Sequence, residues 1–112
     1  WNVWLVHSIS RAESIPPLRE KVDAACAAIG RNPAEIGRTA TVLVDYIGTD
    51  DVAMRLMRPA SEPEPLTGDP AEIAAALRAF TAEGISHIQV FLQPNNLEGI
   101  ERFAPVLEEL KK

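Results

Sequence analysis

Side chains that could do chemistry stand at the ends of short apolar runs in this sequence. His7 and Ser8 follow the first run, and Asp45 and Tyr46 lie at the end of the second. A histidine titrates near neutral pH and can serve as a general base or a substrate contact, and Asp45 and Tyr46 could bind a polar substrate group. The alternatives are a solvated histidine in a serine-rich loop and an aspartate that caps the following turn.

The third apolar run is followed by amide side chains. Gln93, Asn95 and Asn96 could hydrogen-bond a ligand, whereas capping of the next helix is the usual role of an asparagine in that place. Near the start of the chain, the ring of Trp1 or of Trp4 could line a pocket or pack in a core.

Metal and nucleophile signatures are absent from the sequence. The two histidines, His7 and His87, are 80 positions apart, so they offer no close pair of metal ligands. Cys26 has no second cysteine to pair with, which excludes an internal disulfide, and we interpret it as a helix-packing residue and not a reactive thiol. His87 begins an apolar run, where we favour a core or interface histidine over a ligand. No nucleotide-binding glycine pattern and no Gly-x-Ser-x-Gly turn occurs.

Composition is that of a soluble globular domain. Its 112 residues suffice for one domain, 46% are hydrophobic, and no apolar run approaches the roughly 20 residues of a membrane helix. The formal net charge is −5 and the basic residues form no stripe, which argues against a nucleic-acid partner. A single cysteine fits a reducing compartment, so we expect a cytoplasmic protein. Because an apolar run is already under way at Trp1, we expect residues 1–112 to be part of a longer polypeptide.

The stretch 66–92 carries the clearest structural signal. Asp69 and Glu72 have the spacing of a capping box, and Gly84 can end the helix in a left-handed conformation. We expect a buried helical stripe formed by Ile73, Ala76, Leu77 and Phe80. The apolar run 85–92 then predicts a parallel strand that is covered on both faces.

Further elements follow from the same rules. Residues 1–6 and 38–47 are rich in strand formers and predict strands. Pro16 opens a helix that ends at Gly30, and we expect its buried face to consist of Leu18, Val22, Ala25, Cys26 and Ile29. The last helix is expected to bend because of Pro105 and to bury Ile100, Phe103, Leu107 and Leu110.

The order of these elements predicts the fold class. Residues 51–57 predict a short helix, and the proline-rich segment 58–66 predicts a surface loop. Strands that alternate with helices predict an α/β fold with three parallel strands joined by right-handed crossovers. Three strands cannot close a barrel, so one face and both edges of the sheet stay open and must meet another surface.

Several segments occur in a recognisable order. They are Trp1-Asn2, the helix end 30–36 (Gly-Arg-Asn-Pro-Ala-Glu-Ile), the helix start 66–73 (Leu-Thr-Gly-Asp-Pro-Ala-Glu-Ile), the turn 83–87 (Glu-Gly-Ile-Ser-His) and the segment 102–104 (Arg-Phe-Ala). As an ordered set they resemble the C-terminal third of the luciferase-like monooxygenases, which are flavin- or deazaflavin-dependent oxidoreductases. The resemblance covers nearly the whole chain, and each of its motifs is structural and not catalytic.

The resemblance implies a (β/α)8 TIM-type barrel, of which residues 1–112 supply about the last three parallel strands with their covering helices. It implies reduced FMN or a deazaflavin as the cofactor of the parent enzyme, and a small organic substrate bound at the carboxyl ends of the strands. The family holds its cofactor with residues of earlier strands, so we expect the isolated chain to bind none. Its partners are then the rest of the barrel, or a second copy at the open sheet edges. The alternative is a free-standing small α/β interaction module without catalytic activity.

Overall fold

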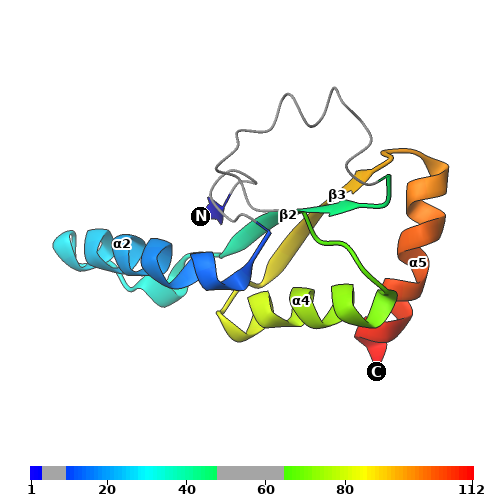
Figure 1. Ribbon diagram of the computed structural model, residues 1–112. Helices are drawn as coiled ribbons and strands as arrows, with labels where there is room; N and C mark the ends of the chain where they lie inside the picture. Colours follow the sequence, from blue (N-terminus) through cyan, green and yellow to red (C-terminus); the bar gives the residue numbers. More distant parts are fainter. Residues whose placement is uncertain (4–9, 48–64) are drawn as a thin grey trace.

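Three parallel strands and three α-helices make up the part of the chain that the computed structural model describes, residues 1–3, 10–47 and 65–112 (Figure 1). The strands are β1 (Asn2–Val3), β2 (Thr39–Asp45) and β3 (His87–Gln93), and the helices are α2 (Ile15–Ala28), α4 (Pro70–Ala82) and α5 (Leu97–Lys111); two short 3-10 helices, η1 (Ala12–Ser14) and η2 (Pro33–Glu35), flank α2. The predicted helix 51–57 lies outside the described residues, as does the proline-rich segment except for its last two positions. Within the described ranges, no helix combines the length and the apolar character that crossing a membrane requires.

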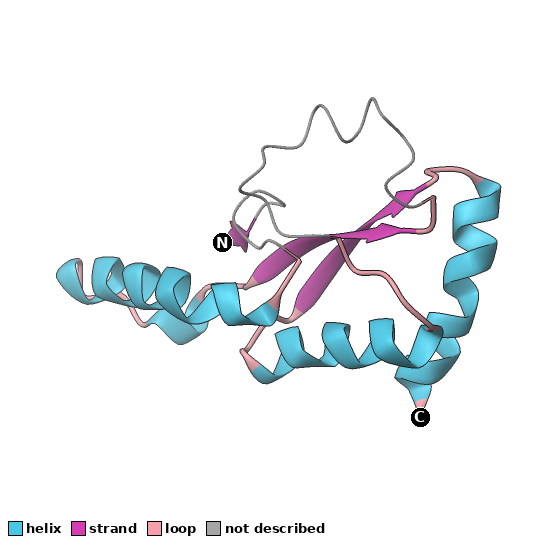
Figure 2. Cartoon of the chain, viewed as in Figure 1, coloured by secondary structure: helices cyan, strands magenta, loops and turns pink. Residues whose placement is uncertain are grey.

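The sheet has the strand order β1-β2-β3, and both pairs are parallel. β2 and β3 pair along their full length, from Thr39 beside His87 to Asp45 beside Gln93. The helices lie to one side of this sheet (Figure 2). The predicted α/β class with a small open parallel sheet is therefore confirmed, and the outer edges of β1 and β3 have no neighbouring strand among the described residues.

Two single residues complete the edge of β2 beyond β1. The hydroxyl oxygen of Ser10 accepts the backbone N–H of Leu43 at 2.9 Å. Leu66 donates its N–H to the Leu43 carbonyl oxygen at 2.9 Å and accepts the Asp45 N–H at 3.0 Å. These bonds satisfy strand groups that the two residues of β1 do not reach.

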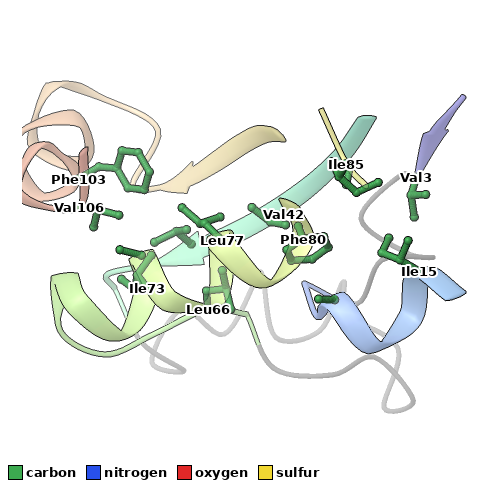
Figure 3. Close-up of a cluster of buried hydrophobic side chains, with 14 residues drawn as sticks. Val3, Ile15, Val42, Leu66, Ile73, Leu77, Phe80, Ile85, Phe103 and Val106 are labelled. Atoms are coloured by element: carbon green, nitrogen blue, oxygen red, sulfur yellow. The ribbon is translucent and has the colours of Figure 1, made fainter. Parts of the chain in front are cut away.

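One hydrophobic core lies between the sheet and the helices (Figure 3). β2 contributes Val42 and Val44, which are fully buried. α4 contributes Ile73, Leu77 and Phe80, each at most 3% exposed, so the predicted stripe of this helix is confirmed at these positions. Burial of a side chain of this size contributes about 1.5–3 kcal/mol, so the packing of these residues in the core contributes substantially to the stability of the fold.

α4 begins and ends as the sequence predicts. A carboxylate oxygen of Asp69 accepts the Glu72 N–H at 2.9 Å, and the Glu72 carboxylate accepts the Asp69 N–H at 2.9 Å, which completes the capping box. Gly84 takes a φ of 86° just beyond the helix. The one deviation in the buried stripe is that Ala74 is fully buried and Ala76 only partly.

α2 buries less of its apolar face than predicted. Cys26 is buried and Leu18 and Val22 are partly buried, but Ala25 is exposed and Ile29 is 75% exposed. The prediction is wrong for the last two because the far end of α2 projects beyond the sheet (Figure 1).

α5 also exposes two apolar residues that were predicted to be buried. Phe103 is buried and Leu110 is partly buried, as predicted, but Ile100 is 60% exposed and Leu107 is 48% exposed. Val106, which the predicted stripe omits, is fully buried. The helix is therefore rotated so that its Phe103 and Val106 side meets the core.

β3 is not covered on both faces, which corrects the expectation for residues 85–92. Burial alternates along the strand as far as Leu92, because helices cover only one side of the sheet, and Gln93 at its end is buried although it belongs to the other side. The partly buried positions are Ile88, Val90 and Leu92, and the exposed ones are His87, Gln89 and Phe91.

Candidate functional site at the carboxyl ends of the strands

The two faces of the sheet differ in chemistry. Side chains alternate between the faces along a strand, so paired residues of neighbouring parallel strands point to the same side. Val42 and Val44 pack in the core beneath the helices, so Asp45 and Gln93, which pair with each other, lie on the opposite side. We call this opposite side the helix-free face; its side chains belong to Asn2, Thr39, Thr41, Leu43, Asp45, His87, Gln89, Phe91 and Gln93.

Most positions of the helix-free face are polar, and they bond in pairs across the strands. Thr39 donates its hydroxyl to the side-chain oxygen of Asn2 at 2.7 Å. Thr41 donates its hydroxyl to the side-chain oxygen of Gln89 at 2.9 Å. These two rungs occupy the amino-terminal half of the strands, and they satisfy polar side chains there, among them the hydroxyl of the buried Thr41.

The carboxyl-terminal half carries an apolar rung and then a polar one. Leu43 pairs with Phe91, whose ring is 41% exposed. Asp45 pairs with Gln93, and both residues are 8% exposed. An exposed phenylalanine therefore lies next to two nearly buried polar side chains on the same face of the sheet. Phe91 was not among the predicted site residues.

Asp45 caps the turn after β2. Its carboxylate oxygen accepts the backbone N–H of Ile47 at 2.8 Å. The capping interpretation of Asp45 is thus confirmed, and the same bond fixes the carboxylate at the rim of the helix-free face. A contact between Asp45 and a substrate stays a prediction.

Tyr46 lies on the other side of the sheet. Its ring packs against the core beside α5, its N–H donates to the Gln93 carbonyl oxygen at 2.7 Å, and its carbonyl oxygen accepts a bond from Arg102 at 2.8 Å. The hydroxyl is closed to solvent and has no hydrogen-bond partner among the residues that the structure describes. Burial raises the pKa of Tyr46 above the ordinary 10.0, and the Arg102 guanidinium opposes this shift. The side chain of Tyr46 therefore lies on the opposite side of the sheet from the side chains of Asp45 and Gln93.

The turn after β3 holds the start of α5 in place. Asn96 accepts the Gly99 N–H at 3.1 Å, which confirms its capping role, and Asn95 is exposed. Gly99 lies so close to this turn that an added Cβ would stand 1.9 Å from the Pro94 carbonyl oxygen. The amides that follow β3 thus divide between a cap at Asn96, a solvated side chain at Asn95 and a nearly buried side chain at Gln93.

The remaining candidates lie apart from this rim or outside the described residues. His7, Ser8 and Trp4 belong to the part of the chain that the structure does not describe. His87 is exposed at the amino end of β3, so it is not a core histidine; an interface role for it stays a prediction. Within residues 1–3, 10–47 and 65–112, no group of three histidine, cysteine or carboxylate side chains could hold a metal ion.

Comparisons with family models, with curated proteins and with solved structures returned no match to this chain.

Proposed function

We propose that this chain is the C-terminal portion of a luciferase-like α/β-barrel oxidoreductase, which uses reduced FMN or a deazaflavin to act on a small organic substrate. The observation that carries this proposal is the rung of Asp45 and Gln93, two nearly buried polar residues at the carboxyl ends of neighbouring parallel strands. In an α/β barrel the face without helices lines the interior, and the active site lies at the carboxyl ends of the strands. The ordered motifs of the family resemblance support the same assignment.

The side chains of this rim have different tasks in the parent enzyme. The Gln93 carboxamide can donate and accept hydrogen bonds, so it orients a polar group of the substrate. The Asp45 carboxylate is held in place by the Ile47 N–H, and it can accept a further hydrogen bond from a donor group of the substrate. The exposed ring of Phe91 forms an apolar floor below them. The chain therefore contributes one wall of the substrate pocket.

The described residues could contact the side of a bound cofactor, but they do not form a binding site for its phosphate group. A flavin phosphate requires cations or unpaired backbone N–H groups. Arg102, a cation at this end of the sheet, already bonds the Tyr46 carbonyl oxygen and the Glu98 carboxylate, and Asn96 caps the start of α5. We therefore place the cofactor anchor in the rest of the parent protein. The bound cofactor supplies either oxygen activation, for reduced FMN, or hydride transfer, for a deazaflavin.

A cytoplasmic location belongs to the same proposal. Cys26 is the one cysteine of the sequence, and it is buried with a free thiol. A single cysteine cannot form a disulfide within the chain, so the protein does not depend on an oxidising compartment for its stability.

One alternative has an observation in its favour. Two apolar grooves, one between β1 and α2 and one between β3 and helices α4 and α5, would also suit a free-standing interaction module. The intact mass of the protein expressed from its native gene separates the two functions. A chain much heavier than 12.2 kDa supports the barrel enzyme, and a chain near 12.2 kDa leaves no room for a flavin site and supports the module.

Substitution of Gln93 tests the pocket wall within the parent protein. Gln93→Met keeps the side-chain volume and removes both hydrogen-bonding groups, so we expect substrate affinity to fall by about tenfold, the equivalent of one hydrogen bond of about 1.4 kcal/mol. Asn95→Ala, two residues away at an exposed position, is the matched control and should leave affinity unchanged. Equal affinity in the Gln93→Met variant and the parent would remove Gln93 from the pocket.

A further inference from the structure

Two glutamines of β3 lie on the helix-free face, and their side chains differ in hydrogen bonding. The side-chain oxygen of Gln89 accepts the Thr41 hydroxyl at 2.9 Å. The Gln93 carboxamide has no hydrogen-bond partner within residues 1–3, 10–47 and 65–112, although Gln93 is only 8% exposed. An unpaired amide in so covered a place destabilises a fold, and Gln89 does not carry this penalty.

The neighbour of Gln93 on β2 is the reason for this difference. Thr41 supplies a hydroxyl donor to the Gln89 oxygen, whereas an ionised carboxylate such as that of Asp45 has no donor to offer. One oxygen of Asp45 already accepts the Ile47 N–H at 2.8 Å. The oxygen of the Gln93 carboxamide is therefore left without a donor from the paired strand.

The polar end of Gln93 is open to a ligand. Within the described part of the chain, the unpaired side-chain atoms that are closed to solvent are the Trp1 Nε1, an Asp23 oxygen and the Tyr46 hydroxyl. The two amide atoms of Gln93 are not among them, so the small exposed part of this residue includes its donor and its acceptor. A molecule outside the described residues can bond both atoms at once.

An apolar surface lies beside this amide. Phe91 is two positions before Gln93 on the same face, so the two side chains are spaced by about 7 Å. Phe91 is 41% exposed and pairs with Leu43 of β2. A flat ring that stacks on Phe91 therefore brings its edge to the Gln93 carboxamide.

We propose that Gln93 and Phe91 select a substrate with a flat, largely apolar ring whose edge carries an N–H group beside a C=O group, as in a lactam or a cyclic imide. A carboxamide holds a donor and an acceptor side by side, and it pairs with such an edge through two hydrogen bonds, as glutamine does with the edge of adenine. The Asp45 carboxylate beside it disfavours an anion, so the bound edge is neutral. This inference rests on the proposed function, which places a substrate at the carboxyl ends of the strands.

Two probe molecules test the substrate class without any substitution. Isoquinolone is a flat bicyclic lactam, and N-methylisoquinolone keeps its ring and carbonyl but lacks the N–H. Ligand-observed NMR titration of the protein expressed from its native gene, with and without saturating cofactor, gives both affinities. We expect isoquinolone to bind about tenfold more tightly, because only its N–H reaches the Gln93 oxygen.

Variants of the full protein separate hydrogen bonding from the bulk of the added methyl group. Gln93→Met has a similar volume and no amide, so it should bind the two probes with similar affinity. Phe91→Leu should weaken both probes several-fold and keep the tenfold preference, because stacking does not depend on the N–H. Asn95→Ala, at an exposed position, is the matched control and should bind as the parent does.

Four results would overturn this inference. They are no detectable binding of isoquinolone, equal affinities of the two probes for the parent, a preference that survives in Gln93→Met, and displacement of isoquinolone by the cofactor. The last result matters because FMN and deazaflavins carry the same kind of edge in their own ring, and displacement would assign the amide to the cofactor and not to the substrate.

The same samples distinguish this inference from the proposed function. Cofactor binding is followed by fluorescence, independently of the probes. A protein that binds its cofactor but shows no preference between the probes would refute the substrate class and leave the oxidoreductase in place. A protein that prefers isoquinolone and binds neither cofactor would refute the oxidoreductase and leave the selectivity of Gln93 in place.

Discussion

Replacing Tyr46 by phenylalanine tests where this side chain lies. The Tyr46 hydroxyl is closed to solvent and has no hydrogen-bond partner in residues 1–3, 10–47 and 65–112, and an unpaired buried hydroxyl destabilises a fold by about 1–3 kcal/mol. Phenylalanine keeps the ring and removes this penalty. Because the ring is only partly buried, we expect Tyr46→Phe to raise the free energy of unfolding by at most about 1 kcal/mol at neutral pH.

The same variant should change the response to alkaline pH. Burial raises the pKa of Tyr46 above 10.0 in the folded chain, although Arg102 opposes the shift. Above pH 10.0 the unfolded chain therefore loses this proton first, so stability falls as the pH rises from 10.0 through the folded-state pKa. The phenylalanine variant lacks this loss, and every other titrating group is common to both proteins, so the difference between them isolates Tyr46.

Two assays measure these effects. Urea unfolding at neutral and alkaline pH gives the free energies of both proteins. Tyr46 is the one tyrosine in the sequence, so the near-ultraviolet absorbance of tyrosinate reports its pKa directly. A loss of more than about 1 kcal/mol at neutral pH would show that the hydroxyl bonds in the folded state. A titration midpoint at or below 10.0 would show that water reaches it, and would return Tyr46 to the candidates for the pocket.

Two local features give further predictions. Asp69→Ala removes the cap of α4 and should lower the free energy of unfolding by about 1 kcal/mol, whereas Asp69→Asn, which keeps a capping oxygen, should cost much less; equal losses in urea unfolding would contradict the capping role. Gly99→Ala places a methyl group against the Pro94 carbonyl oxygen and should cost about 1–3 kcal/mol. At Gly37 an added Cβ would have no atom within 4 Å, so Gly37→Ala should change the free energy of unfolding by no more than about 0.5 kcal/mol. If thermal unfolding showed Gly37→Ala to be less stable than Gly99→Ala, the close packing of Gly99 on the turn would be refuted.

The local signals of the sequence predict α4 well. The bonds between Asp69 and Glu72 join residues three positions apart, and the left-handed φ of Gly84 is a property of one residue. Signals of this range depend little on the rest of the fold, so the sequence contains them completely. Helix α4 therefore has the predicted start and end.

The exposure of apolar residues on α2 and α5 could not be predicted from local sequence signals. Periodicity says that Ile29 and Ile100 belong to apolar helix sides, but it does not say whether anything covers these sides. In residues 1–3, 10–47 and 65–112 the coverage ends with β1 and β3, and both isoleucines remain exposed. Their pattern predicts a contact that lies outside the described structure.

The composition of the candidate site was partly predictable. Asp45 and Tyr46 are adjacent in a strand, so the two-residue period already places them on opposite faces, and that signal could have separated them. The pairing of Phe91 with Leu43, and of Gln93 with Asp45, depends on the register between β2 and β3, which no local pattern contains. Phe91 was missed for this reason.

The most direct test of the oxidoreductase assignment is a fluorescence titration of the protein expressed from its native gene, with FMN and with a deazaflavin in separate experiments. We expect saturable binding of one of the two cofactors by the full protein and binding of neither by residues 1–112 alone. Failure of the full protein to bind either cofactor would contradict the barrel enzyme and leave the interaction module as the function of this chain.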